Sequence, residues 1–167
     1  MAIIASASGN GKTTLGRALA ARIDVPFVEL DAMVHGPNWV ETPDDALRAQ
    51  LAPILAEPGW VIDGSYQSKI GNLVLDAADA IVWLDLPMHV WLPRLVRRTA
   101  RRYVGLEPMW NGNRETLRGM FWGKDSLFGY ALRSHFRRRR ELPRKLAAHR
   151  VIRLRTPGEV SAFLASV

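Results

Sequence analysis

The chain has 167 residues, of which 48% are hydrophobic and 23% charged, and it contains no cysteine. This length and composition indicate one globular domain over residues 1–167, and they exclude disulfides and thiolate metal sites. No apolar run is long enough to cross a membrane, and the first residues lack the pattern of a signal peptide. We therefore expect a cytoplasmic protein with no membrane partner, and the oligomeric state stays open.

The net charge of +7 is distributed unevenly along the chain. Residues 1–93 contain 5 Lys and Arg against 11 Asp and Glu, whereas residues 94–155 contain 18 against 4. A basic half of this kind indicates either a nucleic-acid surface or a cleft that collects the phosphates of small substrates. The run from Arg137 to Arg140 could equally be the solvated end of a helix.

Apolar runs alternate with amphipathic runs along the whole chain. The predicted strands are residues 2–5, 26–30, 60–64, 80–85 and 151–154. Five predicted helices are residues 12–22, 67–76, 88–103, 113–121 and 124–141. Another begins at Thr42 and should be bent or shortened by Pro53, and the last begins at the capping box at 156–159. This alternation is typical of the α/β class, with a parallel sheet and helices on both faces. Ligands of such folds bind beyond the carboxyl ends of the strands.

The segment Ser6-Ala7-Ser8-Gly9-Asn10-Gly11-Lys12-Thr13-Thr14 joins the first strand to the first helix. Its small residues allow successive backbone N–H groups to surround a phosphate, and the helix N-terminus favours the same anion. We expect nucleotide binding by the stretch 8–14, that is Ser8, Gly9, Asn10, Gly11, Lys12, Thr13 and Thr14. Lys12 would contact the β- and γ-phosphates and the Thr13 hydroxyl would bind the metal, so the predicted cofactors are ATP and Mg²⁺.

Ser6 departs from the pattern G-x-x-x-x-G-K-[ST], because it occupies the position of the first glycine. Glycine gives the backbone freedom there, so a serine requires a negative φ or little strain. Two alternatives follow: a strand-to-helix turn without a ligand, or an ATP-binding module without turnover.

Three acidic residues, Asp31, Asp63 and Asp85, each end a predicted strand. Phosphoryl transfer requires a metal near the phosphates and an oriented acceptor. We assign Asp63 to the metal's water shell, and Asp31 to a hydrogen bond with the acceptor hydroxyl, where it could also serve as base. Each acid could instead cap a loop.

The phosphate loop, the pair Asp63-Gly64, and the segment Leu84-Asp85-Leu86-Pro87 followed by Arg94, Arg97 and Arg98 resemble the adenylate-kinase-like P-loop kinases. Within this family, the resemblance is to proteins described as adenylate-kinase-related or DNA topology modulation proteins. Their signature sequences are similar to the segments Asp31 to Trp39, Ile62 to Tyr66 and Gly112 to Glu115.

The resemblance implies a P-loop NTPase three-layer sandwich with strand order 2-3-1-4-5 and a short helical lid at about 99–125. It also implies that Arg94 lies on the adenine and that the catalytic Arg98 reaches the phosphates, with Arg114, Arg133 and Arg137 as candidate lid arginines.

One departure concerns the acceptor. Adenylate kinases carry an arginine for the AMP phosphate where this chain has Ser65-Tyr66-Gln67, so the acceptor need not be AMP. Trp39, Tyr66 and Trp110 could line an acceptor pocket or belong to the core. We therefore expect an ATP-dependent kinase of a nucleotide or small molecule, and the alternative is a nucleotide-dependent DNA-binding regulator.

Overall fold

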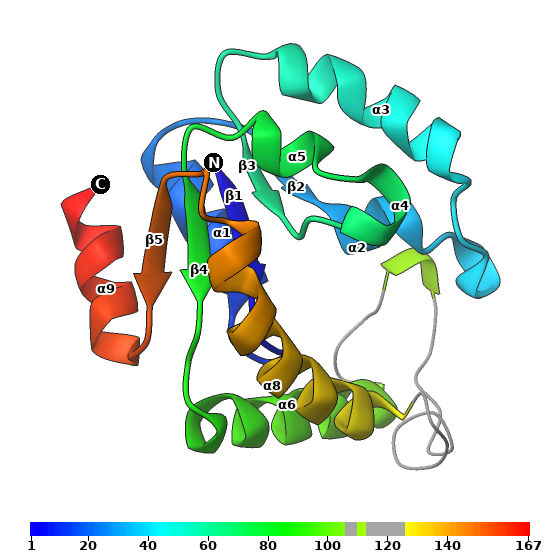
Figure 1. The fold of residues 1–167 in the computed structure, drawn as a ribbon. Helices are drawn as coiled ribbons and strands as arrows, with labels where there is room; N and C mark the ends of the chain where they lie inside the picture. The colour runs from blue at the N-terminus through cyan, green and yellow to red at the C-terminus, as the bar shows by residue number, and fades with distance from the viewer. Residues whose placement is uncertain (106–109, 113–125) are drawn as a thin grey trace.

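The structure is a computed structural model that describes residues 1–105, 110–112 and 126–167. Its centre is a five-stranded sheet in the order β2-β3-β1-β4-β5, in which every neighbouring pair is parallel (Figure 1). The strands are β1 (Ala2–Ala5), β2 (Phe27–Glu29), β3 (Val61–Asp63), β4 (Ile81–Leu84) and β5 (Val151–Leu154). The predicted α/β class and strand order are both confirmed.

Helices connect the strands and lie on both faces of the sheet (Figure 1). The α-helices are α1 (Lys12–Arg22), α2 (Leu30–Val34), α3 (Asp44–Ala56), α4 (Gln67–Ile70), α5 (Leu73–Asp76), α6 (Met88–Tyr103), α8 (Leu127–Lys145) and α9 (Pro157–Ser166). Two short 3-10 helices are η1 (Pro37–Trp39) and η2 (Trp110–Gly112). The expected strand 26–30 is shorter than predicted, because the chain turns into α2 directly after Glu29.

The core consists of two apolar layers, one on each face of the sheet. On one face, Ile3 and Val82 pack with α1 and α9. On the other face, Ile4, Ile62 and Ile81 pack with α2, α3, α5 and the C-terminal end of α8. Burial of each such side chain stabilises the fold by roughly 1.5–3 kcal/mol. Because both faces are covered, the strands are nearly continuous apolar runs, and the architecture is the predicted three-layer sandwich.

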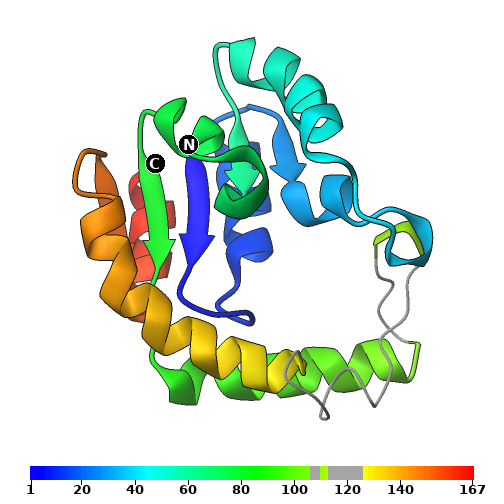
Figure 2. The same cartoon turned by 45° about the vertical axis from the view of Figure 1, so that its right-hand side comes forward.

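Helix α6 passes beneath the carboxyl ends of β1 and β4, and the N-terminal half of α8 lies beside it (Figure 2). A third apolar cluster joins them, formed by Trp91 and Leu95 of α6, Ala131 of α8 and Ala7 of the phosphate loop. The loop is therefore packed directly on these two helices, which cover the sheet at the carboxyl ends of β1 and β4.

Three of the described helices continue through an internal proline. Pro53 lies inside α3, Pro93 inside α6 and Pro143 inside α8. Proline lacks the N–H that would bond to the carbonyl four residues earlier, so each helix continues without one hydrogen bond. We expected Pro53 to bend or shorten its helix, yet α3 extends three residues further, to Ala56.

The described part of the predicted lid consists of the end of α6 and η2. Asn111 of η2 donates hydrogen bonds to the backbone oxygens of His35 (2.6 Å) and Ala32 (3.3 Å), so η2 lies against α2. The predicted helix 113–121 and Arg114 lie outside the described residues. In the part of the chain that the structure describes, no helix has the length and apolar character needed to cross a membrane.

Candidate active site

The phosphate loop leaves β1 at Ala5 and enters α1 at Lys12. Two glycines in the left-handed region shape it, Gly9 with φ 82° and Gly11 with φ 91°. A Cβ on Gly9 would lie 2.7 Å from the Trp91 backbone oxygen and 3.0 Å from Leu95 Cβ. Glycine is therefore required at position 9 both by its backbone conformation and by the contact with α6.

Asn10 fixes the middle of the loop from inside. Its buried side chain donates to the Ala7 backbone oxygen at 2.9 Å and accepts from the Leu86 N–H at 3.0 Å. Because the side-chain amide of Asn10 is already hydrogen-bonded within the protein, we expect its backbone N–H to make the predicted contact with the nucleotide. Ser8, Thr14 and the other predicted nucleotide-binding residues of the loop all line one cleft.

Lys12 and Thr13 converge on Asp63 at the start of α1. Lys12 Nζ lies 2.9 Å from Asp63 Oδ1, and the Thr13 hydroxyl donates to Asp63 Oδ2 at 2.6 Å. The Asp63 side chain is 2% exposed. Sheet order produces this cluster, because β3 pairs with β1 and brings Asp63 level with Ile3. The structure thus unites three of the predicted site residues.

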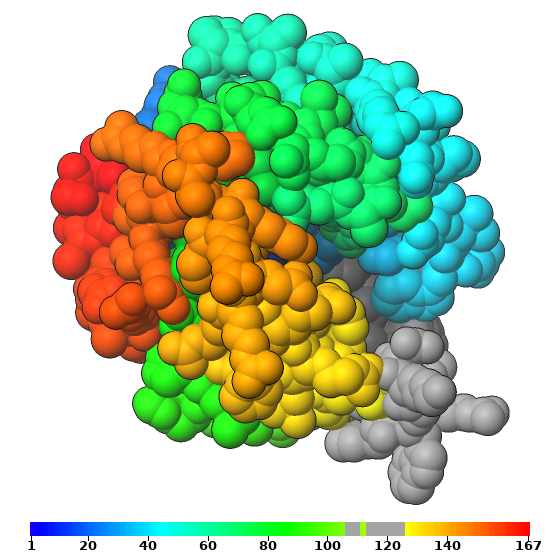
Figure 3. Space-filling model, viewed as in Figure 1, coloured from blue at the N-terminus to red at the C-terminus, as the bar shows by residue number. Residues whose placement is uncertain are grey.

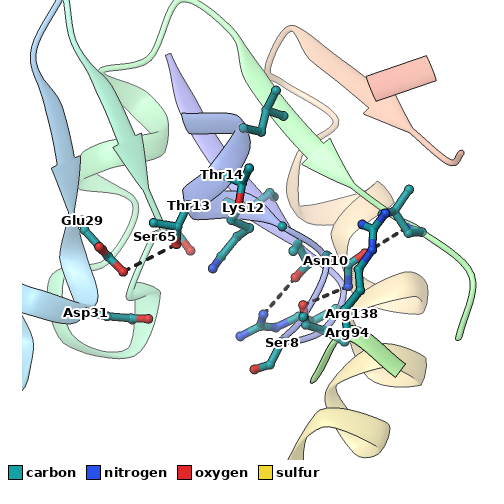
Figure 4. A pocket seen from close by; sticks show the side chains of 18 of the residues that line it. Ser8, Asn10, Lys12, Thr13, Thr14, Glu29, Asp31, Ser65, Arg94 and Arg138 are labelled. Atoms are coloured by element: carbon teal, nitrogen blue, oxygen red, sulfur yellow. Dashed lines mark hydrogen bonds between the residues drawn. The ribbon is translucent and has the colours of Figure 1, made fainter. Parts of the chain in front are cut away.

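Glu29 is a fourth member that sequence reasoning missed. It is paired with Asp63 across β2 and β3, and its Oε1 lies 3.5 Å from Thr13 Oγ1 (Figure 4). The Thr13 hydroxyl has one proton, so the much shorter contact with Asp63 is its hydrogen bond and Glu29 is a near neighbour. The signal that selected Asp63, an acid at a strand end, applies to Glu29 as well.

These side chains fit a magnesium ion accompanied by nucleotide phosphates. The Thr13 hydroxyl and the carboxylates of Asp63 and Glu29 are hard oxygen donors. Within the described residues, no three His, Asp or Glu side chains group into a metal cage. Mg²⁺ in nucleotide sites needs no such cage, because one or two carboxylates, waters and phosphate oxygens complete its shell.

Asp31 stands across the cleft from the phosphate loop (Figure 4). The Tyr66 hydroxyl donates to Asp31 Oδ1 at 2.6 Å and lies 3.1 Å from His35 Nε2. Burial, and then the negative charge and hydrogen bond of Asp31, raise the pKa of Tyr66 above its ordinary value. Tyr66 therefore remains a proton donor at neutral pH and orients the Asp31 carboxylate.

Replacing Tyr66 with phenylalanine should weaken acceptor use selectively. The ring remains but Asp31 loses its donor, and hydrogen bonds to charged groups contribute about 1.5–3 kcal/mol. We expect kcat/KM for the acceptor to fall roughly 10- to 150-fold, with the KM for ATP unchanged. Steady-state kinetics would check this, with Tyr103→Phe at the exposed end of α6 as the matched control. An equal fall in both variants would contradict the role.

Arginines occupy the opposite side of the cleft from Glu29 and Asp31 (Figure 4). Arg94 Nη1 lies 3.9 Å from the position that a Cβ on Gly11 would take, which puts it beside the phosphate loop. Arg98, one helical turn further along α6, lines the same cleft. Arg138 of α8 also lines it and donates to the Ala5 backbone oxygen at 2.9 Å. The predicted Arg94 therefore lies beside the loop, and the predicted Arg98 lines the same cleft.

The cleft that these groups share has a volume of about 1460 Å³. It extends from the phosphate loop to Asp31, His35 and Trp39. The surface is hollowed between α8 and the elements α2 and α4 (Figure 3). This space is large enough for a nucleotide and a second small molecule together.

The buried hydrogen bonds of Ser6 explain why a serine occupies the position of the first glycine in the loop pattern. It is fully buried, and its φ is not in the left-handed region. Its hydroxyl donates to Asp85 Oδ1 at 2.6 Å and accepts from Trp83 Nε1 at 3.0 Å. Asp85 is also paired with Arg139 Nε at 3.1 Å and Arg153 Nε at 3.0 Å. The third strand-end acid thus holds the base of the loop against α8 and β5.

Replacing Ser6 with alanine should destabilise the fold. The change leaves the buried Trp83 N–H without its acceptor and Asp85 without one donor. An unsatisfied buried polar group costs about 1–3 kcal/mol, and we expect a loss of that size in the free energy of unfolding, measured by urea denaturation. Ser166→Ala, which removes an exposed hydroxyl of α9, is the matched control and should change stability by less than about 0.5 kcal/mol. Equal stability of the two variants would contradict the account.

The chain is similar to known proteins in sequence and in fold. No known family's sequence profile matches the chain. A shikimate kinase from Sulfurihydrogenibium sp. (strain YO3AOP1) is 26% identical over 101 residues, which cover 52% of this chain and 61% of the relative. The match therefore spans about three fifths of the relative's length.

Two solved structures superpose over almost the entire chain. A shikimate kinase from Acinetobacter baumannii, in complex with shikimate, has a TM-score of 0.58 and 18% identity, and the match covers 99% of this chain and 88% of that one. A gluconokinase from Sinorhizobium meliloti 1021 has a TM-score of 0.50 and 22% identity, covering 99% and 90%. The chain has the P-loop kinase fold that these small-molecule kinases share.

Proposed function

We propose that this protein transfers the γ-phosphoryl group of Mg·ATP to a hydroxyl group of a small molecule. One observation carries the proposal. Lys12 and Thr13 of the phosphate loop meet Asp63 at one side of the cleft, while the oriented carboxylate of Asp31 stands at the other. A donor site and an acceptor site thus share one space. The similarity to shikimate kinase and gluconokinase supports this reaction class.

The phosphate loop would bind the triphosphate. The Lys12 ammonium is paired with Asp63, and phosphate oxygens would become its further partners. The loop backbone and the N-terminus of α1 would bind the same oxygens. Mg²⁺, held by Thr13 with Asp63 and Glu29 through water, would neutralise charge on the phosphates when bound. Arg94 would stack on the base and Arg98 would neutralise charge on the phosphoryl group.

Asp31 would select and orient the acceptor. Its Oδ1 accepts the hydrogen bond from the Tyr66 hydroxyl, so Oδ2 would accept a hydrogen bond from the attacking hydroxyl. That bond fixes the hydroxyl oxygen toward the phosphate, and the carboxylate accepts the proton that the hydroxyl loses. Phosphoryl transfer relies mainly on such positioning and on charge stabilisation.

The finer assignments follow from the resemblance. Membership of the adenylate-kinase-like group would make a nucleoside monophosphate one acceptor to test. The basic stretch 94–155 makes duplex DNA a second possible ligand, in a regulatory role. We place the enzyme in the cytoplasm, where ATP is supplied.

Release of ADP from Mg·ATP tests the proposal. The reaction is run without acceptor, with small hydroxylated metabolites, with nucleoside monophosphates and with duplex DNA, and Lys12→Ala serves as the inactive control. We expect release that depends on one class of small molecule. Release that ignores every small molecule and rises with DNA would favour the regulator, and tight ATP binding without any release would favour a module without turnover.

A further inference from the structure

The charges of the cleft are segregated between its two sides. The side that carries the acceptor site comes from residues 29–75, and its charged lining groups are the carboxylates of Glu29 and Asp31. The remaining polar groups on this side are uncharged hydroxyls and amides, together with the imidazole of His35. The arginines that line the cleft from α6 and α8 lie opposite (Figure 4).

The described lysine and arginine that belong to the acceptor side have acidic partners. Arg48 and Lys69 are the only lysine or arginine residues between positions 23 and 93, and neither lines the cleft. Lys69 Nζ lies 3.0 Å from Glu41 and 3.1 Å from Asp44.

Arg48 is held in a similar way, by Asp45 at 2.8 Å and by the Lys69 backbone oxygen at 2.8 Å. From α1, Arg17 lies 3.5 Å from Glu29, and Lys12 is paired with Asp63. Among the described residues of 29–75, no lysine or arginine lines the cleft.

An aromatic side chain borders the same space. Trp39 lines the cleft with 43% of its surface exposed. Its backbone and that of Asn38 are both left-handed, with φ 61° and 57°. Tyr66, at φ 40°, is a third such residue beside Asp31. Non-glycine residues in this region are strained, and strain of this kind gathers at ligand-binding sites. The His35 ring packs edge-on to Trp39, 5.5 Å between centroids, and steadies it.

We infer that the phosphoryl acceptor is an uncharged, ring-shaped polyhydroxy compound, such as a neutral sugar, a cyclitol or a nucleoside; this rests on the kinase function proposed above. Hydroxyl groups donate well to the carboxylate of Asp31, and a ring presents its face to the exposed indole of Trp39. A carboxylate or phosphate on the acceptor would instead face the like charge of Asp31, and among the described residues no lysine or arginine from 29–75 lines the cleft to compensate it. The acceptor would thus differ in charge from both shikimate and gluconate.

Matched pairs of acceptors test the inference. ADP release from Mg·ATP is measured with glucose and gluconate, with myo-inositol and shikimate, and with adenosine and AMP. We expect at least one uncharged member to exceed its anionic partner by 100-fold or more in kcat/KM. An acid that equals or exceeds its partner in the most active pair would overturn the inference, as would inactivity of all three uncharged compounds while Mg·ATP still binds.

A charge-switch variant adds a second readout. Ser65 lines the acceptor side next to Tyr66, and Ser65→Lys introduces a cation at that position. We expect it to shift the ratio of kcat/KM for the acid to kcat/KM for the uncharged partner at least 10-fold toward the acid. Ser166→Lys, at the C-terminal end of α9 and outside the lining of the cleft, should leave this ratio unchanged. An unchanged ratio in Ser65→Lys would count against the inference. Failure of the wild-type protein to bind Mg·ATP would overturn the proposed function itself, so the two failures are distinguishable.

Discussion

Lys12→Ala is expected to abolish ATP turnover, with kcat/KM reduced at least about 1,000-fold. Lys12 is the cation of the phosphate loop that would lie against the β- and γ-phosphates, where charge changes during transfer. Lys12→Arg should recover little of this loss, because the planar guanidinium does not replace a compact ammonium in so narrow a loop. Coupled measurement of ADP release with a saturating acceptor gives the rate.

The same substitution removes a partner of the buried Asp63 carboxylate, so loss of stability has to be separated from loss of chemistry. Breaking a buried ion pair by removing one member is strongly destabilising. Lys12→Ala combined with Asp63→Asn removes both charges, and should recover stability without recovering turnover. Lys69→Ala is the matched lysine control, and we expect its turnover to remain near the wild-type value. Wild-type turnover in Lys12→Ala would refute the assignment of the loop.

Asp31→Asn is expected to reduce kcat by about 100- to 10,000-fold, the range of a general base or orienting carboxylate. Asparagine has the same shape and its amide oxygen still accepts the hydrogen bond from Tyr66, but it is uncharged and does not take the proton of the acceptor. The dissociation constant of Mg·ATP should stay at its wild-type value, because Asp31 lies across the cleft from the loop. Acceptor kinetics and a separate ATP titration measure the two effects.

Asp45→Asn provides the control for charge alone. Asp45 is highly exposed, on the first turn of α3, and its partner is Arg48. We expect this variant to bind ATP and turn over as the wild type does. Equal losses of ATP binding and transfer in Asp31→Asn would remove the acceptor role from Asp31.

Much of the fold could be predicted, because it depends on local patterns. Strands buried on both faces are continuous apolar runs, as in Ile81–Leu84, and the helices between them carry apolar residues at helical spacing. The phosphate loop was recognisable because its glycines and Lys12 follow a strand and open a helix. The strand order came from the resemblance, since composition and periodicity do not specify which strands pair.

The missed parts of the site depend on contacts between distant segments. Glu29 meets Thr13 only because β2 lies beside β3. The short helix α2 that follows β2 was not predicted, and its first residue, Leu30, was expected at the end of the strand. The bond from Ser6 to Asp85 joins residues 79 positions apart, so the serine looked like a weakness of the loop when it is a buried hydrogen-bonding group. The hydroxyl of Tyr66 reaches Asp31 across 35 positions, although both residues belong to segments that the resemblance had singled out.

The central claim is that the γ-phosphoryl group passes from ATP to a hydroxyl group of a bound small molecule. Phosphorus NMR of a reaction containing the protein, Mg·ATP and the most active acceptor follows that group directly. We predict that the γ-phosphate signal declines as a phosphate monoester signal grows by the same amount, and that Lys12→Ala shows neither change. Growth of inorganic phosphate alone, or an unchanged ATP spectrum with every acceptor, would contradict the claim.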